Sequence, residues 1–100
     1  MGGMHVGVCK LILRLPENDD LKGKRRALQS IISRVKAKFN VAVAEVEEMD
    51  SWRTIILGIS CVSNDGRYAD SMLSTVVRYI ARSRGDLEVV DYEIEVMEGV

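Results

Sequence analysis

The sequence is poor in the residue types on which catalytic sites depend. Its 100 residues include one histidine, His5, and one proline. A lone histidine at the start of a strand-like run gives little basis for Ser-His or Cys-His catalysis. The glycines form neither a GxxxxGK nor a GxGxxG run, so no nucleotide-binding loop is indicated. We therefore predict that the chain is not an enzyme, with no catalytic residues and no small-molecule substrate.

The small number of cysteines excludes further classes. Cys9 and Cys61 have no CxxC spacing and no histidine cluster near them, so we predict no metal site and no other cofactor. Both are flanked by apolar residues, which is typical of buried, reduced thiols in a cytoplasmic protein. The apolar run near the N-terminus is interrupted by Lys10 and Arg14, and it falls short of the ~20 apolar residues of a membrane span. We therefore expect no membrane association.

What the sequence does contain is an ordinary balance for one globular domain, with 47% hydrophobic and 29% charged residues. We expect residues 4–98 to form this domain and residues 1–3 to be disordered or a remnant of cloning. Asp20 is a predicted N-cap for a helix over 21–38, whose first turn Gly23 should weaken. A second helix is predicted to follow the turn at 64–66 and to end near Arg84, before Gly85.

Four strand-like runs surround these two helical segments. They cover residues 5–15, 41–46, 53–63 and 87–97. In the last run, Val90 and Tyr92 belong to the side predicted to be buried, and the alternating acidic residues belong to the wet side. The order predicts an α+β fold, namely a ferredoxin-like βαββαβ sandwich. Its antiparallel four-stranded sheet would have the order 4-1-3-2, with two helices on one face. A different α+β sandwich with another strand order is the alternative.

Several motifs together resemble the YlxP-like family of small bacterial proteins. They are Met4-His5-Val6-Gly7-Val8, Leu21-Lys22-Gly23-Lys24-Arg25-Arg26, Phe39-Asn40-Val41-Ala42-Val43-Ala44-Glu45-Val46, Val62-Ser63-Asn64-Asp65 and Asp91-Tyr92-Glu93-Ile94-Glu95. The resemblance covers nearly the whole chain from Met4 onward. It implies a ferredoxin-like fold, no known activity, and a gene that often lies among translation and ribosome-maturation factors. The family usually reads Ser-Leu-Lys-Glu-Lys-Arg where this chain reads Asp20-Leu21-Lys22-Gly23-Lys24-Arg25, so the capping-box glutamate is missing here.

The net charge of −1 conceals a strongly uneven distribution. Eleven of the 14 basic residues fall in the two helical segments, and most acidic residues fall near the hairpin at 45–50 or on the last strand. A basic helical face attracts phosphate, and RNA is the commonest macromolecular source of phosphate. The predicted phosphate contacts are Lys22, Lys24, Arg25, Arg26, Arg34 and Lys38. The simpler interpretation is that these residues solvate the outer side of two amphipathic helices.

Two other surfaces enter the functional hypothesis. Only 5% of the residues are aromatic, and the two central strand-like runs contain none apart from the imidazole of His5, which argues against stacking of RNA bases on the sheet. Trp52, beside the hairpin, either covers the end of the core or anchors a protein partner. Apolar residues on both sides of the central strands favour a homodimer that covers the sheet.

We predict a small cytoplasmic accessory protein that associates with ribosomal RNA or ribosomal particles. The alternative is a homodimeric protein-interaction module without a nucleic-acid role.

Overall fold

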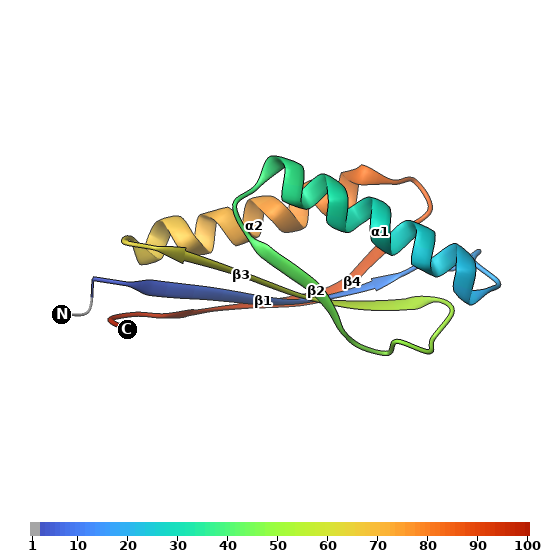
Figure 1. Ribbon diagram of the computed structural model, residues 1–100, viewed down its shortest axis with the longest axis horizontal. Coiled ribbons are helices and arrows are strands. Elements are labelled where there is room, and N and C mark those ends of the chain that lie inside the picture. The colour runs from blue at the N-terminus through green and yellow to red at the C-terminus, as the bar shows by residue number, and fades with distance from the viewer. Residues whose placement is uncertain (1–2) are drawn as a thin grey trace.

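The computed structural model describes residues 3–100, and the six predicted elements form in the predicted order (Figure 1). They are β1 (His5–Arg14), α1 (Leu21–Lys38), β2 (Ala42–Glu47), β3 (Thr54–Ser63), α2 (Gly66–Ser83) and β4 (Glu88–Met97). The expectation of a disordered or added start concerns residues 1–3, of which the first two lie outside the described residues. Neither helix combines the length and apolar character needed to cross a bilayer, within residues 3–100.

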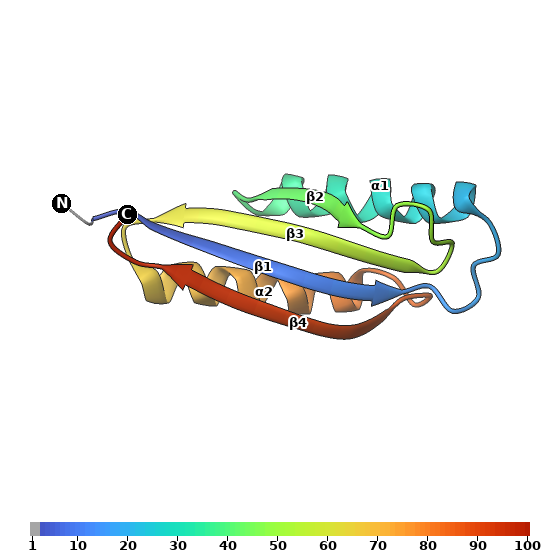
Figure 2. The same ribbon diagram turned by 90° about the horizontal axis from the view of Figure 1, so that it is seen from below.

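The four strands form one antiparallel sheet in the order β2-β3-β1-β4, which confirms the predicted order 4-1-3-2. The two helices lie together on one face of this sheet (Figures 1 and 2). The central strands β1 and β3 pair with each other over ten residues, from the pair His5–Ser63 to the pair Arg14–Thr54. The ferredoxin-like α+β fold predicted from the sequence is therefore confirmed.

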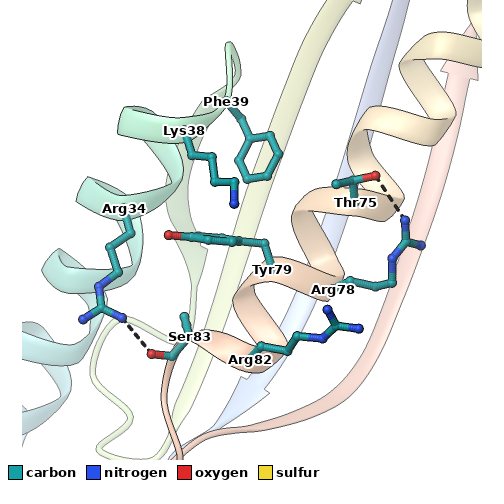
Figure 3. Close-up of a pocket in the computed structure, with 8 residues that line it drawn as sticks. All are labelled: Arg34, Lys38, Phe39, Thr75, Arg78, Tyr79, Arg82 and Ser83. Atoms are coloured by element: carbon teal, nitrogen blue, oxygen red, sulfur yellow. Dashed lines mark hydrogen bonds between the residues drawn. The ribbon is translucent and has the colours of Figure 1, made fainter.

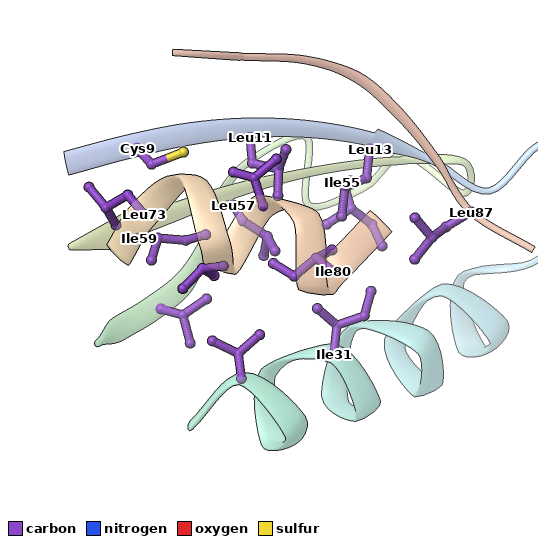
Figure 4. Close-up of a cluster of buried hydrophobic side chains, with 14 of the residues drawn as sticks. Cys9, Leu11, Leu13, Ile31, Ile55, Leu57, Ile59, Leu73, Ile80 and Leu87 are labelled. Atoms are coloured by element: carbon purple, nitrogen blue, oxygen red, sulfur yellow. The ribbon is translucent and has the colours of Figure 1, made fainter. Parts of the chain in front are cut away.

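The core lies between the sheet and the helices (Figure 4). Alternate side chains of the central strands, such as Leu11 in β1 and Leu57 in β3, are fully buried against α2 and α1. Leu73 and Ile80 of α2 pack against them from the helix side of the sheet. Each such buried aliphatic side chain contributes about 1.5–3 kcal/mol. Cys9 and Cys61 are also buried and free, as predicted, and burial raises the pKa of the Cys9 thiol to about 11.

The two helices cover different parts of the sheet. α2 packs over β1, β3 and β4, whereas α1 packs mainly on β2 and beside α2. Figure 2 shows this division, with α1 behind β2 at the upper edge and α2 behind β1 and β4. The two helices therefore meet each other along a seam above the sheet.

The start of α1 explains its unusual glycine. Asp20 is the N-cap, as predicted, and its Oδ1 accepts a hydrogen bond from the Gly23 amide at 2.6 Å. A Cβ atom added to Gly23 would lie 2.2 Å from Oδ1 of Asn18. The Asn18 amide in turn donates to the carbonyls of Asp20 and Trp52, both at 2.6 Å. Glycine is therefore needed here to make room for the Asn18 side chain, which ties the helix start to the β2–β3 connection.

The predicted alternation of the last strand is only partly correct. Val90 and Tyr92, expected on the buried side, are 54% and 46% exposed. The register of β1 and β4 shifts between Ile12, which pairs with Asp91, and Leu13, which pairs with Val89. This bulge leaves Val90 without a partner, and β4 has no neighbour on its outer side. Burial resumes further along the strand, at the partly buried Ile94 and Val96.

Candidate phosphate-binding groove

A groove lies at the seam between the C-terminal half of α1 and the C-terminal half of α2 (Figure 3). The residues that line it include four cationic side chains, two from each helix, and no acidic one. The lining residues are Arg34, Lys38, Phe39, Thr75, Arg78, Tyr79, Arg82 and Ser83. The two helices thus bring together charges that lie some 40 residues apart in sequence.

Two of the four cations are already oriented by hydrogen bonds to protein groups. The Arg34 guanidinium donates to the carbonyl of Ser83 at 2.7 Å and so bridges the two helices. The Arg78 guanidinium donates to the Thr75 hydroxyl at 3.1 Å. Lys38 and Arg82 make no hydrogen bond or ion pair with a protein group in the described part of the chain. Arg34 therefore links the two helices at the groove, while Lys38 and Arg82 are available to a ligand.

Two aromatic rings line the same groove. Phe39 and Tyr79 meet edge to face, with ring centroids 5.4 Å apart and an interplanar angle of 74°. The Lys38 ammonium lies 4.7 Å from the centroid of Tyr79, a cation–π contact. Figure 3 shows the Tyr79 ring reaching from α2 across the space toward α1. The groove therefore offers apolar ring surface as well as positive charge.

The ends of the helices account for part of this positive charge but not for all of it. Cations in the last turn of a helix interact favourably with its carbonyl-rich end, by about 0.3–1 kcal/mol each. Lys38 in α1 and Arg82 in α2 are in that position. Arg34 and Arg78 lie before the last turns. Arg34 instead donates to the carbonyl of Ser83, the last residue of α2, and Arg78 donates to Thr75 within that helix.

The neighbouring Arg84 does not belong to the groove. Its guanidinium makes two hydrogen bonds of 2.8 Å to the carboxylate of Asp86. These bonds hold the pKa of Asp86 below its usual value of 3.8 and raise the pKa of Arg84. Arg84 is therefore neutralised by its own acidic partner.

Lys24, one of the six residues predicted to contact phosphate, is buried, with 1% of its surface exposed. Its ammonium lies 2.9 Å from Oε2 of Glu45, an ion-pair contact without hydrogen-bond alignment. It also donates to the carbonyl of Glu48 at 2.6 Å. Glu48 has a positive φ of 59°, a left-handed conformation that is costly for a non-glycine residue. Lys24 therefore joins α1 to the β2–β3 hairpin, and its assignment to the phosphate-binding set is corrected.

The other predicted residues fall into separate places. Arg34 and Lys38 line the groove. Lys22, Arg25 and Arg26 are exposed on the N-terminal half of α1, away from it. Trp52, the predicted partner contact, is 54% exposed in the β2–β3 connection, so it does not cover the core.

The sequence prediction missed Tyr79 and did not join Arg78 and Arg82 to the α1 cations. Arg78 and Arg82 are four residues apart, so the predicted helix places them on one side of α2. Tyr79 has the spacing of the α2 core stripe, which hides its second role as groove lining. No sequence signal shows that α1 lies beside this part of α2. Within residues 3–100, no three His, Cys, Asp or Glu side chains come together to hold a metal ion.

Solved structures with a similar fold are distant in sequence. The de novo designed protein Foldit4 superposes with a TM-score of 0.53 at 18% identity, over 93% of this chain and 96% of that one. A C-terminal segment of the alpha subunit of aIF2 from Pyrococcus abyssi gives 0.52 at 15% identity, over 94% of this chain and 50% of that one. The designed protein LFR1 1, with a ferredoxin fold, gives 0.51 at 16% identity, over 96% and 85%. These likenesses show the fold alone.

The sequence comparisons are more specific. Uncharacterized protein YlxP of Bacillus subtilis (strain 168) is 37% identical over 60 residues, which are 60% of this chain. The match spans 65% of the length of the Bacillus protein. The family model described as "Protein of unknown function (DUF503)" matches residues 6–94 and so includes the groove. The YlxP-like resemblance is thereby confirmed, and the chain belongs to the DUF503 family of proteins of unknown function.

Proposed function

We propose that this protein is a cytoplasmic accessory protein that associates with RNA, and through RNA with ribosomal particles, by holding phosphate groups in the groove between α1 and α2. The observation that carries this proposal is that Arg34 and Lys38 of α1 line the same groove as Arg78 and Arg82 of α2, with no acidic residue in the lining. Two of these cations, Lys38 and Arg82, make no hydrogen bond or ion pair with a protein group among the described residues. Such a site attracts phosphate by charge, and guanidinium groups hold it by paired hydrogen bonds.

RNA is favoured over a small anion because basic residues continue beyond the groove. Lys22, Arg25 and Arg26 add exposed positive charge on the N-terminal half of α1, outside the groove. A polymer of phosphates engages both parts at once, whereas a small anion uses only one. The sheet does not offer the usual RNA-binding surface of this fold, because the central strands carry no Phe, Tyr or Trp, and their one imidazole, His5, lies at the start of β1.

The test is co-sedimentation with ribosomal subunits from a bacterial lysate at about 50 mM and about 500 mM salt, a range that breaks phosphate contacts. We expect association at the lower salt and its loss at the higher salt. The double variant Arg34→Gln/Arg82→Gln should abolish low-salt association. Lys36→Gln, on the same helix but outside the groove, is the matched control and should keep most of it. Equal association of both variants, or none of the wild type at either salt, would rule the proposal out.

A homodimer formed through the open face of the sheet is a second candidate. On this face Val6 of β1 lies between its pairing partners Val62 of β3 and Met97 of β4. Val62 is 66% exposed and Met97 is 48% exposed. Two exposed apolar side chains that flank the half-buried Val6 across three strands form the kind of surface that an interface covers.

Light scattering coupled to size-exclusion chromatography tests this candidate. A mass of twice 11.2 kDa for the wild type and of 11.2 kDa for Val62→Asp is the expected pair of results. A monomeric wild type at about 100 μM, well above the Kd of stable dimers, would reject the homodimer. The mass of the Trp52→Ala variant should be measured in the same way, because an exposed tryptophan is a common anchor for protein partners.

A further inference from the structure

The groove contains more than phosphate binding requires. Charge alone would suit the backbone of any nucleic acid, and it would be as effective on a convex, purely basic helix surface. Here the Phe39–Tyr79 ring pair and the four cations line the same hollow of about 500 Å³, and Lys38 lies over the Tyr79 ring. That volume is within the range of sites that take a small organic molecule. The additional feature to be explained is therefore an aromatic surface at the centre of a cationic site.

A duplex cannot use this aromatic surface. Its bases are paired and stacked inside, and it presents only phosphates and groove edges to a protein. An unpaired nucleotide presents a free base, which stacks on aromatic rings regardless of its identity. A ring inside a concave site, between cations of two helices, thus suits a ligand that carries a planar base and a phosphate together.

We propose that the groove binds one unpaired nucleotide of an RNA strand, with its phosphate held by Arg34, Lys38 and Arg82 and its base against the ring of Tyr79. This inference rests on the proposed function and narrows it to single-stranded RNA. Lys38 has a specific part in it. Its ammonium now lies over the Tyr79 ring, where the base would bind. When the nucleotide binds, this ammonium moves to the phosphate, and the base takes its place on the face of the Tyr79 ring.

In this proposal Arg34 and Arg78 keep the hydrogen bonds that they already make. Arg34 remains bound to the carbonyl of Ser83 through one nitrogen and keeps further N–H groups for the phosphate. Arg78 is held by Thr75 beside the groove and lends charge without direct contact. Figure 3 shows the Arg78 guanidinium turned toward Thr75, away from the Tyr79 ring and from α1.

The experiment compares two RNA probes of equal charge by fluorescence anisotropy at about 50 mM salt, where phosphate contacts are strong. One is a labelled single-stranded oligouridylate, and the other is a blunt RNA duplex with the same number of phosphates. We expect wild-type protein to bind the single strand at least tenfold more tightly. Tyr79→Leu should weaken single-strand binding about five- to a hundredfold, the range found for loss of one stacked base, and leave duplex binding unchanged.

Tyr79→Phe is the matched variant, since it keeps the ring and should retain single-strand binding. Chemical shifts of the Tyr79 ring protons provide a test that needs no variant. They should move strongly on addition of uridine 5′-monophosphate, because the base stacks on the ring, and much less with ribose 5-phosphate, which can draw Lys38 from the ring but lacks the base. A response to the free nucleotide without preference for the single strand would overturn the assignment to RNA. Equal, salt-dependent binding of both RNA probes, unaffected by Tyr79→Leu, would overturn the inference and leave phosphate binding intact. Absence of binding to either probe would overturn the inference together with the proposed function.

Discussion

The two halves of α1 carry similar charge but have different roles. In the N-terminal half, Lys24 is buried and held by Glu45 and the Glu48 carbonyl, so its charge stabilises the fold. In the C-terminal half, Arg34 and Lys38 lie in a groove with two cations of α2. The difference comes from what the helix packs against. Its first half meets the acidic hairpin, and its second half meets a basic stretch of another helix. A run of positive charge on a helix therefore shows its function only when the opposing surface is known.

The variant with the largest expected effect on stability is Lys24→Met, which tests the role of the N-terminal half of α1. Loss of the ammonium leaves the Glu45 carboxylate, which is 16% exposed, without its partner. Breaking a buried ion pair from one side costs about 3–5 kcal/mol, and we expect about 2–4 kcal/mol here because water reaches Glu45 in part. Urea denaturation measures the free energy of unfolding. Arg25→Ala, at the next, exposed position, is the control and should change it by less than about 0.5 kcal/mol. Equal effects of the two variants would show that the buried Lys24 stabilises the fold no more than the exposed Arg25 does.

A second test concerns Gly23, in the same half of the helix. Gly→Ala inside a helix usually stabilises by about 0.5–1 kcal/mol. Here the new Cβ would displace Asn18 and its hydrogen bonds to Asp20 and Trp52. We expect Gly23→Ala to lower the free energy of unfolding by about 1–2 kcal/mol. Gly85→Ala, where the added Cβ meets nothing within 4 Å, should be neutral or slightly stabilising. A stabilised Gly23→Ala variant would show that Asn18 adapts at no cost.

A third test addresses the C-terminal half. Arg34→Ala removes the hydrogen bond that joins α1 to the end of α2. Because the side chain is exposed, we expect a loss of only about 1 kcal/mol in the free energy of unfolding. The same variant should strongly reduce low-salt RNA binding. Lys24→Met is expected to show the reverse pattern, with a large loss of stability and little loss of affinity in the folded protein. If the two variants behaved alike, the two halves of α1 would not differ as the structure indicates.

The smallest effect is expected from a comparison of Arg84, the C-cap residue of α2, with Arg82 in the last turn of that helix. Hydrogen bonds from Arg84 lower the pKa of Asp86 from its usual value of 3.8. A lowered pKa in the folded state stabilises the protein above pH 3.8, and this stabilisation is lost as the pH falls through the folded-state pKa. It should be well under about 1 kcal/mol, because the pair is partly exposed. Carboxyl NMR titration should show the pKa of Asp86 rising in Arg84→Gln and staying unchanged in Arg82→Gln.

Local signals made most of the fold predictable. The apolar spacing over 21–38 and the cap at Asp20 define α1 with the bounds that the structure has, because both depend on neighbours within one or two turns. The apolar character of both sides of β1 and β3 placed them at the centre of the sheet. Val90 was assigned to the wrong environment because a bulge depends on the pairing partner and leaves no mark in the alternation itself.

The groove was only partly predictable, because it depends on contacts between distant segments. Arg34 and Lys38 could be named from the charge run. The burial of Lys24 depends on a hairpin that lies more than 20 residues further along the chain. The role of Tyr79 depends on where α1 crosses α2. Spacing along one element cannot report either contact.

The restricted packing of α1 has a consequence for how the molecule opens. Since α1 rests mainly on β2 and α2, the segment from α1 to β2 can separate from the rest with less loss of buried surface than α2 could. Its amides should therefore exchange with deuterium through a partial opening, before the paired amides of β1 and β3. The groove spans the boundary between this segment and α2. A ligand that bridges Arg34 and Arg82 would fasten them together, and slower exchange in α1 would report its presence from a distance.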